Sequence, residues 1–350
     1  MKNVLITGGF GFIGSNFVKN LLENDNGIGY FPIILDSLTY AGNKTNLDKL
    51  NKEKYIFFKG DICDEVLVKD LFEKYAFEGV FHFAAESHVD RSIDGPSAFI
   101  NTNIIGTFNL LNICRQYYTE SNSNFKFIHV STDEVYGELD HDGYFTEDTP
   151  YNPSSPYSAS KASSDHLARA WNRTYGLPVI ITNCSNNYGA FQFPEKLIPL
   201  MIINCLDWKL LPVYGDGQNV RDWLFVDDHC KAIKTVYENG KVGDTYNIGG
   251  NNEIKNIEIV NTICKVLDDI KPSRNGKSYS ELITFVKDRP GHDFRYAIDA
   301  KKIQSELGWF PNESFETGIE RTINWYIKNE VWWRSIQDGN YKQERLGSGV

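Results

Sequence analysis

Residues 4–16 read VLITGGFGFIGSN, a short apolar run that turns through glycines into the start of a helical pattern. Gly8, Gly11 and Gly14 are spaced three apart, so they permit a tight turn and let the backbone approach a bound pyrophosphate. The charge of that group then lies at the N-terminus of the following helix, where free N–H groups point outward. A glycine triplet alone is a weak signal, so its surroundings decide what it means.

The chain on either side of this turn alternates short apolar runs with helical patterns. We expect strands at 4–7, 31–36, 55–61 and 79–85, and helices at 15–24 and 66–75. Strands that read as continuous apolar runs are typical of a parallel sheet covered by helices on both faces. The sequence therefore predicts an α/β protein built on a doubly wound Rossmann parallel sheet.

An acid follows the glycine turn at the distance that a dinucleotide site requires. Asp36 ends the second predicted strand, 22 residues beyond Gly14, where a carboxylate can accept hydrogen bonds from an adenosine ribose. An acid at this point favours NAD over NADP. Because ligands of open α/β sheets bind at the carboxyl ends of the strands, the further cofactor contacts expected are Asp61, Ile62, Phe83, Ala84, Ala85 and Ser87.

The second half of the chain predicts two long helices and then a change of rhythm. The helices are expected at 98–118 and 155–176, the latter with Ser155 as N-cap and Gly176 closing it. Beyond about residue 189, irregular segments mix with short helices, which indicates a smaller mixed α/β C-terminal substrate domain. The expected division is 1–187 for the cofactor domain with a return at about 222–255, 188–221 and 256–330 for the substrate domain, and 331–350 as a tail.

Composition excludes several other classes of protein. A net charge of −10 argues against general affinity for nucleic acid, and no apolar run approaches the length that spans a bilayer. The start of the chain does not resemble a signal peptide, so we expect a cytoplasmic protein with no membrane partner. The six cysteines form no C-x-x-C pair and the histidines lack ligand spacing, so no metal site is expected.

Four Tyr-x-x-x-Lys sequences occur, and only their context separates them. A tyrosine and a lysine four apart on a helix share a face, so the ammonium can lower the pKa of the phenol and make it a usable base. Three pairs lie on a predicted strand, in a predicted loop or across the end of a helix. Only Tyr157 and Lys161 lie inside a well-capped helix, close to the strand that carries Thr132.

The stretch HVSTDEVYGE at 129–138 places two carboxylates, Asp133 and Glu134, directly after a predicted buried strand. Adjacent acids at such a point are most often a solvated loop. Two carboxyls in different surroundings can instead divide the roles of general acid and general base. Since successive strand residues point to opposite faces, both acids and Thr132 can reach one ligand only if the strand ends at about Thr132.

The motifs GGFGFIG, LTYAGN, AAESHVDRS, STDEVYG, SSPYSASKASSDHL, NCSNNYG, FPEKLIP, RDW, YNIGG and DRPGHD occur in this order. In them the chain resembles the dTDP-glucose 4,6-dehydratase family of extended short-chain dehydrogenases/reductases, from about residue 2 to about 328. The glycine turn and the Tyr-x-x-x-Lys pair mark the superfamily, whereas Thr-Asp-Glu before Val-Tyr-Gly marks the dehydratases.

The resemblance implies a redox-neutral dehydration of a nucleotide-linked hexose. Tyr157, with Lys161 and Thr132, takes the proton of the C4 hydroxyl while hydride passes to NAD. Glu134 then removes the C5 proton, and Asp133 protonates the departing C6 hydroxyl. Hydride returned to C6 completes a 4-keto-6-deoxy sugar and regenerates a tightly bound NAD.

The resemblance also implies residue contacts and a partner. Phe12, Ile13, Thr102, Tyr157, Lys161 and Asn187 complete the expected cofactor set. The expected substrate contacts are Ser87, Thr132, Asn186, Lys196, Leu197, Pro212, Tyr214, Arg221, Asn256, Arg289 and His292. Arg221 is the candidate for the diphosphate, its alternative being an ion pair with Asp222 or Asp227. Helices 98–118 and 155–176 are expected to pair with those of a second subunit in a homodimer.

Two other functions remain open at the level of sequence. A related nucleotide-sugar epimerase or decarboxylase would share the glycine turn and the tyrosine, but an epimerase needs no acid and base beyond that tyrosine. A catalytically silent NAD-binding scaffold would have no use for an activated phenol. The pair Asp133 and Glu134 therefore speaks against an epimerase, and the intact set Thr132, Tyr157 and Lys161 speaks against a scaffold.

Overall fold

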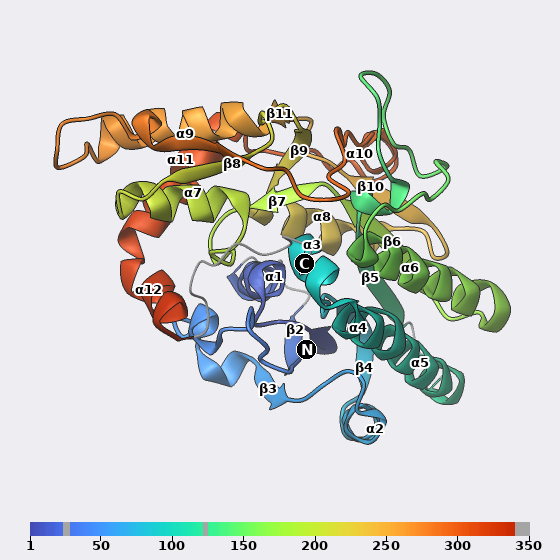
Figure 1. Cartoon of the computed structure of the whole chain (residues 1–350). Coiled ribbons are helices and arrows are strands. Elements are labelled where there is room, and N and C mark those ends of the chain that lie inside the picture. Colours follow the sequence, from blue (N-terminus) through green and yellow to red (C-terminus); the bar gives the residue numbers. More distant parts are fainter. Residues whose placement is uncertain (24–28, 122–124, 340–350) are drawn as a thin grey trace.

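The computed structural model describes residues 1–23, 29–121 and 125–339 of the chain. Its largest element is a seven-stranded sheet in the order β10-β6-β5-β4-β1-β2-β3, in which every neighbouring pair is parallel. The strands are β1 (Lys2–Thr7), β2 (Tyr30–Asp36), β3 (Ile56–Lys59), β4 (Phe77–His82), β5 (Lys126–Thr132), β6 (Val179–Cys184) and β10 (Thr245–Ile248). The predicted doubly wound sheet is confirmed (Figure 1).

Helices cover both faces of this sheet. Successive strand residues point to opposite sides, so each face contributes side chains to a separate core. Val4 and Ile6 belong to a core shared with helices α1 (Phe12–Glu23), α8 (Val226–Asn239) and α10 (Lys301–Leu307). Leu5, between them, packs into a second core. That core contains residues of helices α2 (Glu65–Lys74), α5 (Thr107–Ser121) and α6 (Pro156–Tyr175).

Two small sheets form a separate lobe beside the large one. One is three-stranded, from β7 (Asn186–Tyr188), β9 (Val220–Phe225) and β11 (Glu253–Lys255), and the other joins β8 (Leu211–Tyr214) to β12 (Ile283–Val286). They share a hydrophobic core with helices α7 (Leu197–Leu206), α9 (Asn256–Ile270), α11 (Phe315–Lys328) and α12 (Glu330–Gly339). Strand β9 thus belongs to this lobe, whereas α8 and β10 return to the large sheet.

The expected tail at 331–350 is wrong for its first part. Residues 330–339 form helix α12, and the Trp333 side chain is fully buried in the core of the small lobe. Its indole Nε1 donates to the carbonyl of Tyr326. Residues 331–339 are therefore a packed helix, while 340–350 lie outside the described residues.

The helix predicted at 98–118 is interrupted by a wider turn. Helix α4 (Pro96–Phe99) passes into a π-helical stretch, η3 (Ile100–Gly106), before α5 begins. Asn103 in this stretch accepts from the backbone N–H of Glu86 and donates to the Glu86 carbonyl and to Ser160. Such π-helical turns often occur at functional sites, and this one fastens the loop after β4.

The helix predicted at 155–176 matches α6. Ser155 and Ser158 form a reciprocal capping box, Pro156 occupies the first turn, and Gly176 closes the helix in a left-handed conformation. The short helices complete the fold: α3 (Val89–Asp94), η1 (Lys44–Leu47), η2 (Lys52–Lys54), η4 (Asp133–Tyr136) and η5 (Tyr279–Leu282).

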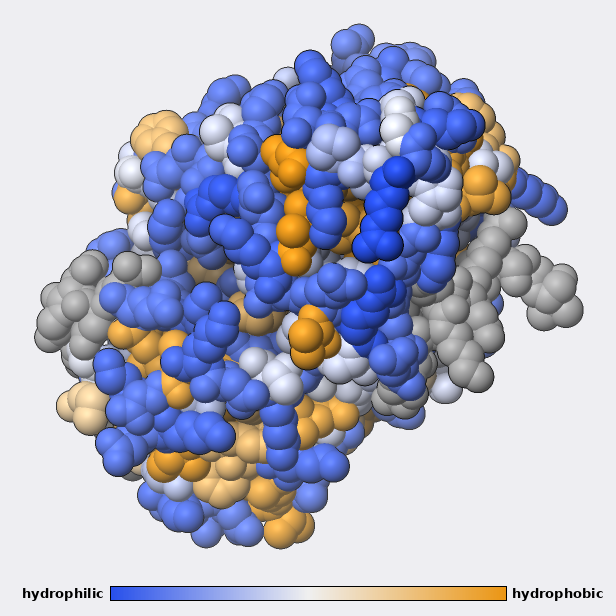
Figure 2. Space-filling model, turned by 90° about the vertical axis from the view of Figure 1, so that its left-hand side faces the viewer, coloured by the Kyte–Doolittle hydropathy of each residue, from blue (hydrophilic) through white to orange (hydrophobic). Residues whose placement is uncertain are grey.

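Among the described residues, no helix combines the length and apolar character needed to cross a bilayer. The face seen in Figure 2 is mostly hydrophilic, with apolar side chains in separate patches between polar ones.

Candidate active site

The glycine turn joins β1 to α1, and each of its glycines meets a different constraint. Gly8 has a positive φ of 70°, and a Cβ there would lie 2.7 Å from the backbone N of Ala84. A Cβ at Gly14 would lie 2.2 Å from the Gly8 carbonyl oxygen, so this glycine lets the helix pack on the turn. A Cβ at Gly11 would meet only that oxygen, at 3.3 Å, so the space beyond Gly11 is open to a ligand.

A cavity of about 100 Å³ lies beside this turn, at the carboxyl ends of the central strands. Of the expected cofactor residues it is lined by Gly8, Gly11, Asp36, Asp61, Ile62, Phe83, Ala84, Ala85 and Thr102. It is not lined by Phe12, Ile13, Gly14, Ser87, Tyr157, Lys161 or Asn187. The cradle of glycines and the acid at the end of β2 fit a dinucleotide.

Asp36 also organises the protein itself. Its two carboxylate oxygens accept hydrogen bonds from the backbone N–H groups of Phe10 and Leu38, each at 2.8 Å. Burial raises the pKa of this carboxyl, while the two backbone hydrogen bonds act to lower it. Since each oxygen can accept a second hydrogen bond, Asp36 can hold the glycine turn and still receive a ribose hydroxyl.

Two expected cofactor residues have other contacts. The Oδ1 atom of Asn187 lies 2.9 Å from Nδ1 of His229, and its amide nitrogen donates to the Ser185 carbonyl. These contacts link β7 to α8. Ser87 is exposed, and its carbonyl accepts from Nζ of Lys196 at 3.0 Å. Sequence alone gave no signal for either contact.

The strand that precedes the two acids ends at the predicted residue. β5 stops at Thr132, and Asp133 begins the 3-10 helix η4. The Thr132 hydroxyl caps this turn by accepting from the backbone N–H of Glu134 at 3.3 Å. The change from strand to helical turn allows Thr132, Asp133 and Glu134 to leave the alternating pattern of a strand.

Asp133 is a buried carboxyl whose surroundings favour the protonated form. Only 1% of the residue is exposed, and its Oδ2 has no hydrogen-bond partner among the described residues. Burial raises the pKa of Asp133 well above its usual range, and the charges of Glu134 and Asp222 raise it further. A carboxyl in this state can donate a proton.

Glu134 has different surroundings from its neighbour. Its side chain lines the large cavity described below and is partly exposed. Burial raises the pKa of Glu134, but the charges of Arg289, Lys196 and Arg221 act to lower it. The surroundings of the two adjacent carboxyls therefore differ: burial and two neighbouring carboxylates outweigh the charge of Arg221 at Asp133, while three cations oppose the effect of burial at Glu134.

Tyr157 and Lys161 lie on α6 behind the acids, and their coupling differs from the prediction. Lys161 Nζ donates to the Val130 carbonyl at 2.9 Å, and burial lowers its pKa. The pKa of Tyr157 is raised well above its usual range by burial and then by Glu134, while a hydrogen bond with Thr132 acts to lower it. In the protein alone, burial therefore outweighs any lowering of the phenol pKa by Lys161.

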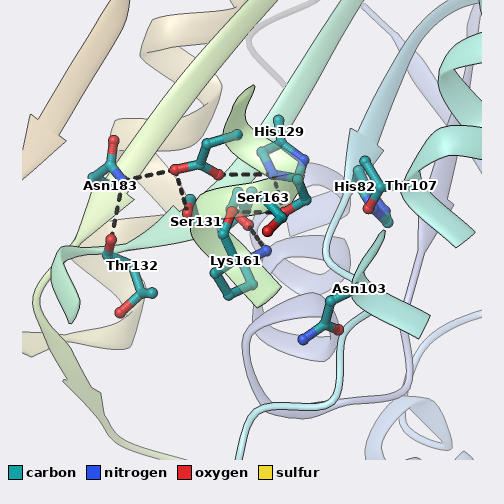
Figure 3. Close-up of polar contacts among 12 residues, drawn as sticks. His82, Asn103, Thr107, His129, Ser131, Thr132, Lys161, Ser163 and Asn183 are labelled. Atoms are coloured by element: carbon teal, nitrogen blue, oxygen red, sulfur yellow. Dashed lines mark hydrogen bonds and ion pairs between the residues drawn. The ribbon is translucent and has the colours of Figure 1, made fainter. Parts of the chain in front are cut away.

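A buried polar network supports the end of β5 (Figure 3). The Asp165 carboxylate on α6 accepts from the Ser131 hydroxyl at 2.9 Å and from the Asn183 amide at 3.3 Å, and lies 3.0 Å from His129 Nε2. Asn183 also donates to the Thr132 carbonyl at 3.0 Å. Burial acts to raise the pKa of Asp165, but His129 and Lys161 bring it below the usual range, so this carboxylate is ionised.

The large cavity, of about 490 Å³, lies between the two lobes. Of the expected substrate residues it is lined by Asn186, Lys196, Leu197, Pro212, Tyr214, Arg221, Asn256, Arg289 and His292, and also by Glu134. Ser87 and Thr132 do not line it. The cavity thus brings together residues from β7, β8, β9 and the loop after β12.

Arg221 lines this cavity and makes neither of the ion pairs considered as its alternative. Its guanidinium donates to the carbonyls of Val220, Phe294 and Asp293 and stacks 4.2 Å from the Tyr296 ring centroid. Asp222 instead accepts from the N–H groups of Gly250 and Asn252. Asp227 pairs with Arg321. The backbone contacts fix the Arg221 fork without neutralising its charge.

Sequence reasoning missed several residues of the cavity. Asp90 accepts from Arg289 and from the Tyr214 hydroxyl, and Glu195, Trp223 and Tyr296 also form the wall. Trp223 could have been found from its place two residues after Arg221, because alternate residues of a strand share a face. Asp90 lies on the short helix α3 and the other two lie in separate loops, so no periodicity points to any of the three.

Among the described residues, no three His, Cys, Asp or Glu side chains gather in a way that could hold a metal ion.

Comparisons with known proteins agree with this geometry. A family model described as GDP-mannose 4,6 dehydratase matches residues 5–322. A dTDP-glucose 4,6-dehydratase of Neisseria meningitidis serogroup B is 55% identical over 357 residues, which is 100% of both chains. The crystal structure of a dTDP-glucose 4,6-dehydratase from Streptomyces venezuelae with NAD bound gives a TM-score of 0.87 at 46% identity, over 95% of this chain and 99% of that one.

The same fold also occurs in an epimerase. A UDP-glucose 4-epimerase of Thermotoga maritima gives a TM-score of 0.83 at 30% identity, over 94% of this chain and 99% of that one. The fold alone therefore does not separate elimination from epimerisation, and the side chains of the site must do so.

Proposed function

The chain belongs to the dTDP-glucose 4,6-dehydratase family, and on this premise we propose that it converts dTDP-glucose to dTDP-4-keto-6-deoxyglucose by elimination of water. The observation that carries the proposal is the contrast between Asp133 and Glu134. Burial and the charges of Glu134 and Asp222 favour the protonated form of the first carboxyl, while three cations around the cavity favour the ionised form of the second. An elimination needs one group that gives a proton and one that accepts it.

The glycine turn and the acid of the smaller cavity would hold NAD. Gly8 and Gly11 admit the pyrophosphate beside α1, and Asp36 receives the ribose hydroxyls. When bound, NAD supplies the site that accepts hydride from the sugar and returns it.

The residues of the chain divide the proton transfers among themselves. Tyr157, hydrogen-bonded to Thr132, takes the proton of the C4 hydroxyl. Lys161 donates to Val130 behind it, and its ammonium favours the phenolate when the tyrosine loses its proton. The carbonyl that forms at C4 makes the C5 hydrogen acidic.

The two acids then act across C5 and C6. Glu134 lines the cavity and takes the C5 proton, and Asp133 donates its proton to the C6 hydroxyl as water leaves. The atoms balance: the C5 proton stays on Glu134, the proton of Asp133 leaves with the C6 hydroxyl as water, and the C5–H bonding pair becomes the C5–C6 double bond. When hydride is returned to C6, Glu134 gives its proton back to C5, and Asp133 regains a proton from solvent. The end of β5 at Thr132 permits this division, since a continued strand would turn one acid away.

The nucleotide would occupy the remainder of the large cavity. Arg221 and Arg289 present their charges to it, and their planar forks match the oxygens of a diphosphate. Burial and the charges of both arginines lower the pKa of His292 to about 4, so this histidine contributes a neutral ring.

A 4-epimerase is the second candidate, because the same fold performs that reaction in a relative. Epimerisation needs only the tyrosine as base, so it gives no role to a protonated carboxyl buried beside the site. We therefore place epimerisation second.

One assay separates these functions. The purified protein is incubated with dTDP-, UDP-, CDP- and GDP-hexoses without added NAD, and the sugar mass is followed. Loss of one water from dTDP-glucose alone supports the proposal. A mass-neutral isomer would favour an epimerase, and no change with any sugar would favour a non-catalytic NAD-binding protein.

We also propose that the chain forms a homodimer through α5 and α6. Four large apolar side chains of these helices and of the π-helical stretch η3 before them are exposed: Ile100 and Ile105 of η3, Phe108 of α5 and Tyr175 of α6 are 45%, 49%, 42% and 45% exposed. A second copy of the two helices would cover them in a four-helix bundle.

A further inference from the structure

Three side chains from distant segments meet between the two cavities. Arg91 on α3 donates from Nε to Oε2 of Glu195 at 2.9 Å, and its guanidinium carbon lies 3.9 Å from the centroid of the Tyr40 ring. The Tyr40 hydroxyl also hydrogen-bonds to Glu195. Arg91, Tyr40 and Glu195 thus form a closed triangle of contacts, which we call the latch.

The latch joins the loop of one cavity to the wall of the other. Tyr40 belongs to the segment after β2, whose residues Thr39, Ala41 and Gly42 line the cofactor cavity. Glu195 lines the substrate cavity, and Phe193 packs edge-on against the Tyr40 ring at 5.4 Å. Arg91 is the cation that holds these two segments together.

Helix α3 is itself anchored from the opposite side. Asp90, the residue before Arg91, accepts from Arg289 and from the Tyr214 hydroxyl, both of which line the substrate cavity. His88 caps the helix by accepting from the backbone N–H of Arg91. Figure 1 places this helix near the middle of the molecule. The latch is therefore built on a support that is fixed to both lobes.

The chemistry proposed above requires such a device. Hydride removed from the sugar must return to the same molecule, so a cofactor that leaves between the two transfers ends the cycle with an oxidised sugar. The segment after β2 covers one side of the cofactor cavity, and the ring of its Tyr40 contacts the Arg91 guanidinium.

We propose that Arg91 is a positioning residue that, through Tyr40 and Glu195, keeps the segment after β2 closed over NAD during turnover. The inference rests on the proposed function for its purpose, but the retention of NAD can be measured without any sugar. Arg91 touches neither reacting atoms nor the glycine turn, so its loss acts on retention and not on the proton transfers.

The test compares Arg91→Met with a matched control, Arg321→Met. Arg321 also stacks on an aromatic ring, at 4.6 Å from Phe225, and also pairs with a glutamate, Glu313, but it lines neither cavity. Each protein is loaded with NAD and passed through gel filtration, and the NAD that remains bound and its dissociation rate are measured. We expect roughly ten-fold faster dissociation from R91M, because a hydrogen bond to a charged group that ties the segment after β2 to the wall of the substrate cavity is lost. R321M also loses ion pairs, but away from both cavities, so it should retain NAD as the wild-type protein does.

Activity provides the second readout. Dehydration by R91M is expected to fall without added NAD and to return to near the wild-type kcat at saturating NAD, with partial rescue in R91K, which keeps the charge but loses the stacking fork. Tyr40→Leu leaves the hydrogen bond between Arg91 and Glu195 in place, and it is the variant to measure if R91M does not fold. It is expected to show the same faster dissociation, and the double variant is expected to add little.

The two proposals fail in different ways. Wild-type retention of NAD in both R91M and Y40L would overturn the latch, as would a loss of kcat that saturating NAD does not restore. If the wild-type protein dehydrates no sugar, the proposed function fails, while the NAD dissociation rates still decide whether Arg91 holds the cofactor.

Discussion

A single carboxyl carries most of the functional argument. Asp133 is buried, its Oδ2 has no hydrogen-bond partner among the described residues, and its pKa is raised first by burial and then by Glu134. Such a group costs stability at neutral pH, since it would ionise freely in the unfolded chain. Strain of this kind is retained where function requires it.

Asp133→Asn should therefore lower activity and raise stability together. Because Asp133 acts as the general acid, its replacement should reduce kcat about 10²- to 10⁴-fold. Because the pKa of Asp133 is higher in the folded state, the wild-type protein loses stability as pH rises from the unfolded pKa toward the folded one, and D133N does not. The gap in unfolding free energy should widen in favour of D133N as pH rises above the unfolded pKa. Urea unfolding measures it, and a gap that does not change with pH would contradict a raised pKa.

The sequence predicted these residues better than it predicted their electrostatics. The end of β5 follows from the need for three neighbours to reach one ligand, and it is observed at Thr132. The raised pKa of Tyr157 could not be read from the Tyr-x-x-x-Lys spacing, because it depends on how deeply α6 is buried and on the bond from Lys161 to Val130. Spacing fixes which residues share a helix face, but not which partner each selects.

At the scale of elements, the glycine turn allows a test that separates fold from ligand. A Cβ at Gly14 would overlap the Gly8 carbonyl, whereas a Cβ at Gly11 meets its nearest atom at 3.3 Å. Gly14→Ala should lower the free energy of unfolding by about 1–3 kcal/mol. Gly11→Ala should leave it within about 0.5 kcal/mol but weaken NAD binding at least ten-fold, since the methyl group projects toward the ligand. Thermal unfolding and NAD titration measure the two effects, and equal losses of stability would contradict this division of roles.

The network behind β5 gives a second prediction at this scale. Asp165 is ionised and fully buried, and it fixes Ser131 and, through Asn183, Thr132. Asp165→Asn removes the charge from this buried hydrogen-bond network. It should lower the free energy of unfolding by about 3–5 kcal/mol at neutral pH and should also lower kcat. Because the pKa of Asp165 is depressed, this contribution is present above the unfolded pKa and is lost as pH falls.

The surface pair of Asp244 with Lys302 is the control, and D244N should cost at most about 1 kcal/mol. Similar losses in D165N and D244N by urea unfolding would show that the network is not structural.

Elements were predictable where periodicity was strong. The parallel strands and the cap of α6 follow from apolar runs and from Ser155 and Pro156. The π-helical stretch at 100–106 and helix α12 were missed, because both depend on tertiary contacts: the bonds of Asn103 to the loop after β4, and the burial of Trp333.

At the scale of the whole molecule, two lobes meet around the large cavity. Its wall draws on loops that are far apart in the sequence, so Asp90, Glu195 and Tyr296 had no local signal. The family resemblance supplied most of the other contacts, but it did not predict that Arg221 would be held by three backbone carbonyls.

The exposed apolar side chains of η3 and α5 make the proposed dimer testable. The double variant Ile105→Asp/Phe108→Asp places two charges on the surface that a second copy would cover. Analytical ultracentrifugation should find a dimer for the wild-type chain and a monomer for the variant, since burying unpaired charges is strongly unfavourable. A matched pair of substitutions at Leu210 and Phe285, also exposed and apolar, should leave the dimer intact. Wild-type protein that sediments as a monomer would contradict the proposed interface.

The central claim is that hydride leaves C4 and returns to C6 of the same sugar while Asp133 and Glu134 remove water between the two transfers. The most direct test uses dTDP-glucose carrying deuterium at C4, with the holoprotein and no added NAD, and locates the label in the product by mass spectrometry and NMR. The account predicts a product that has lost one water and carries the deuterium at C6. A product that keeps all its atoms with the label still at C4, or one that loses water without deuterium at C6, would contradict it.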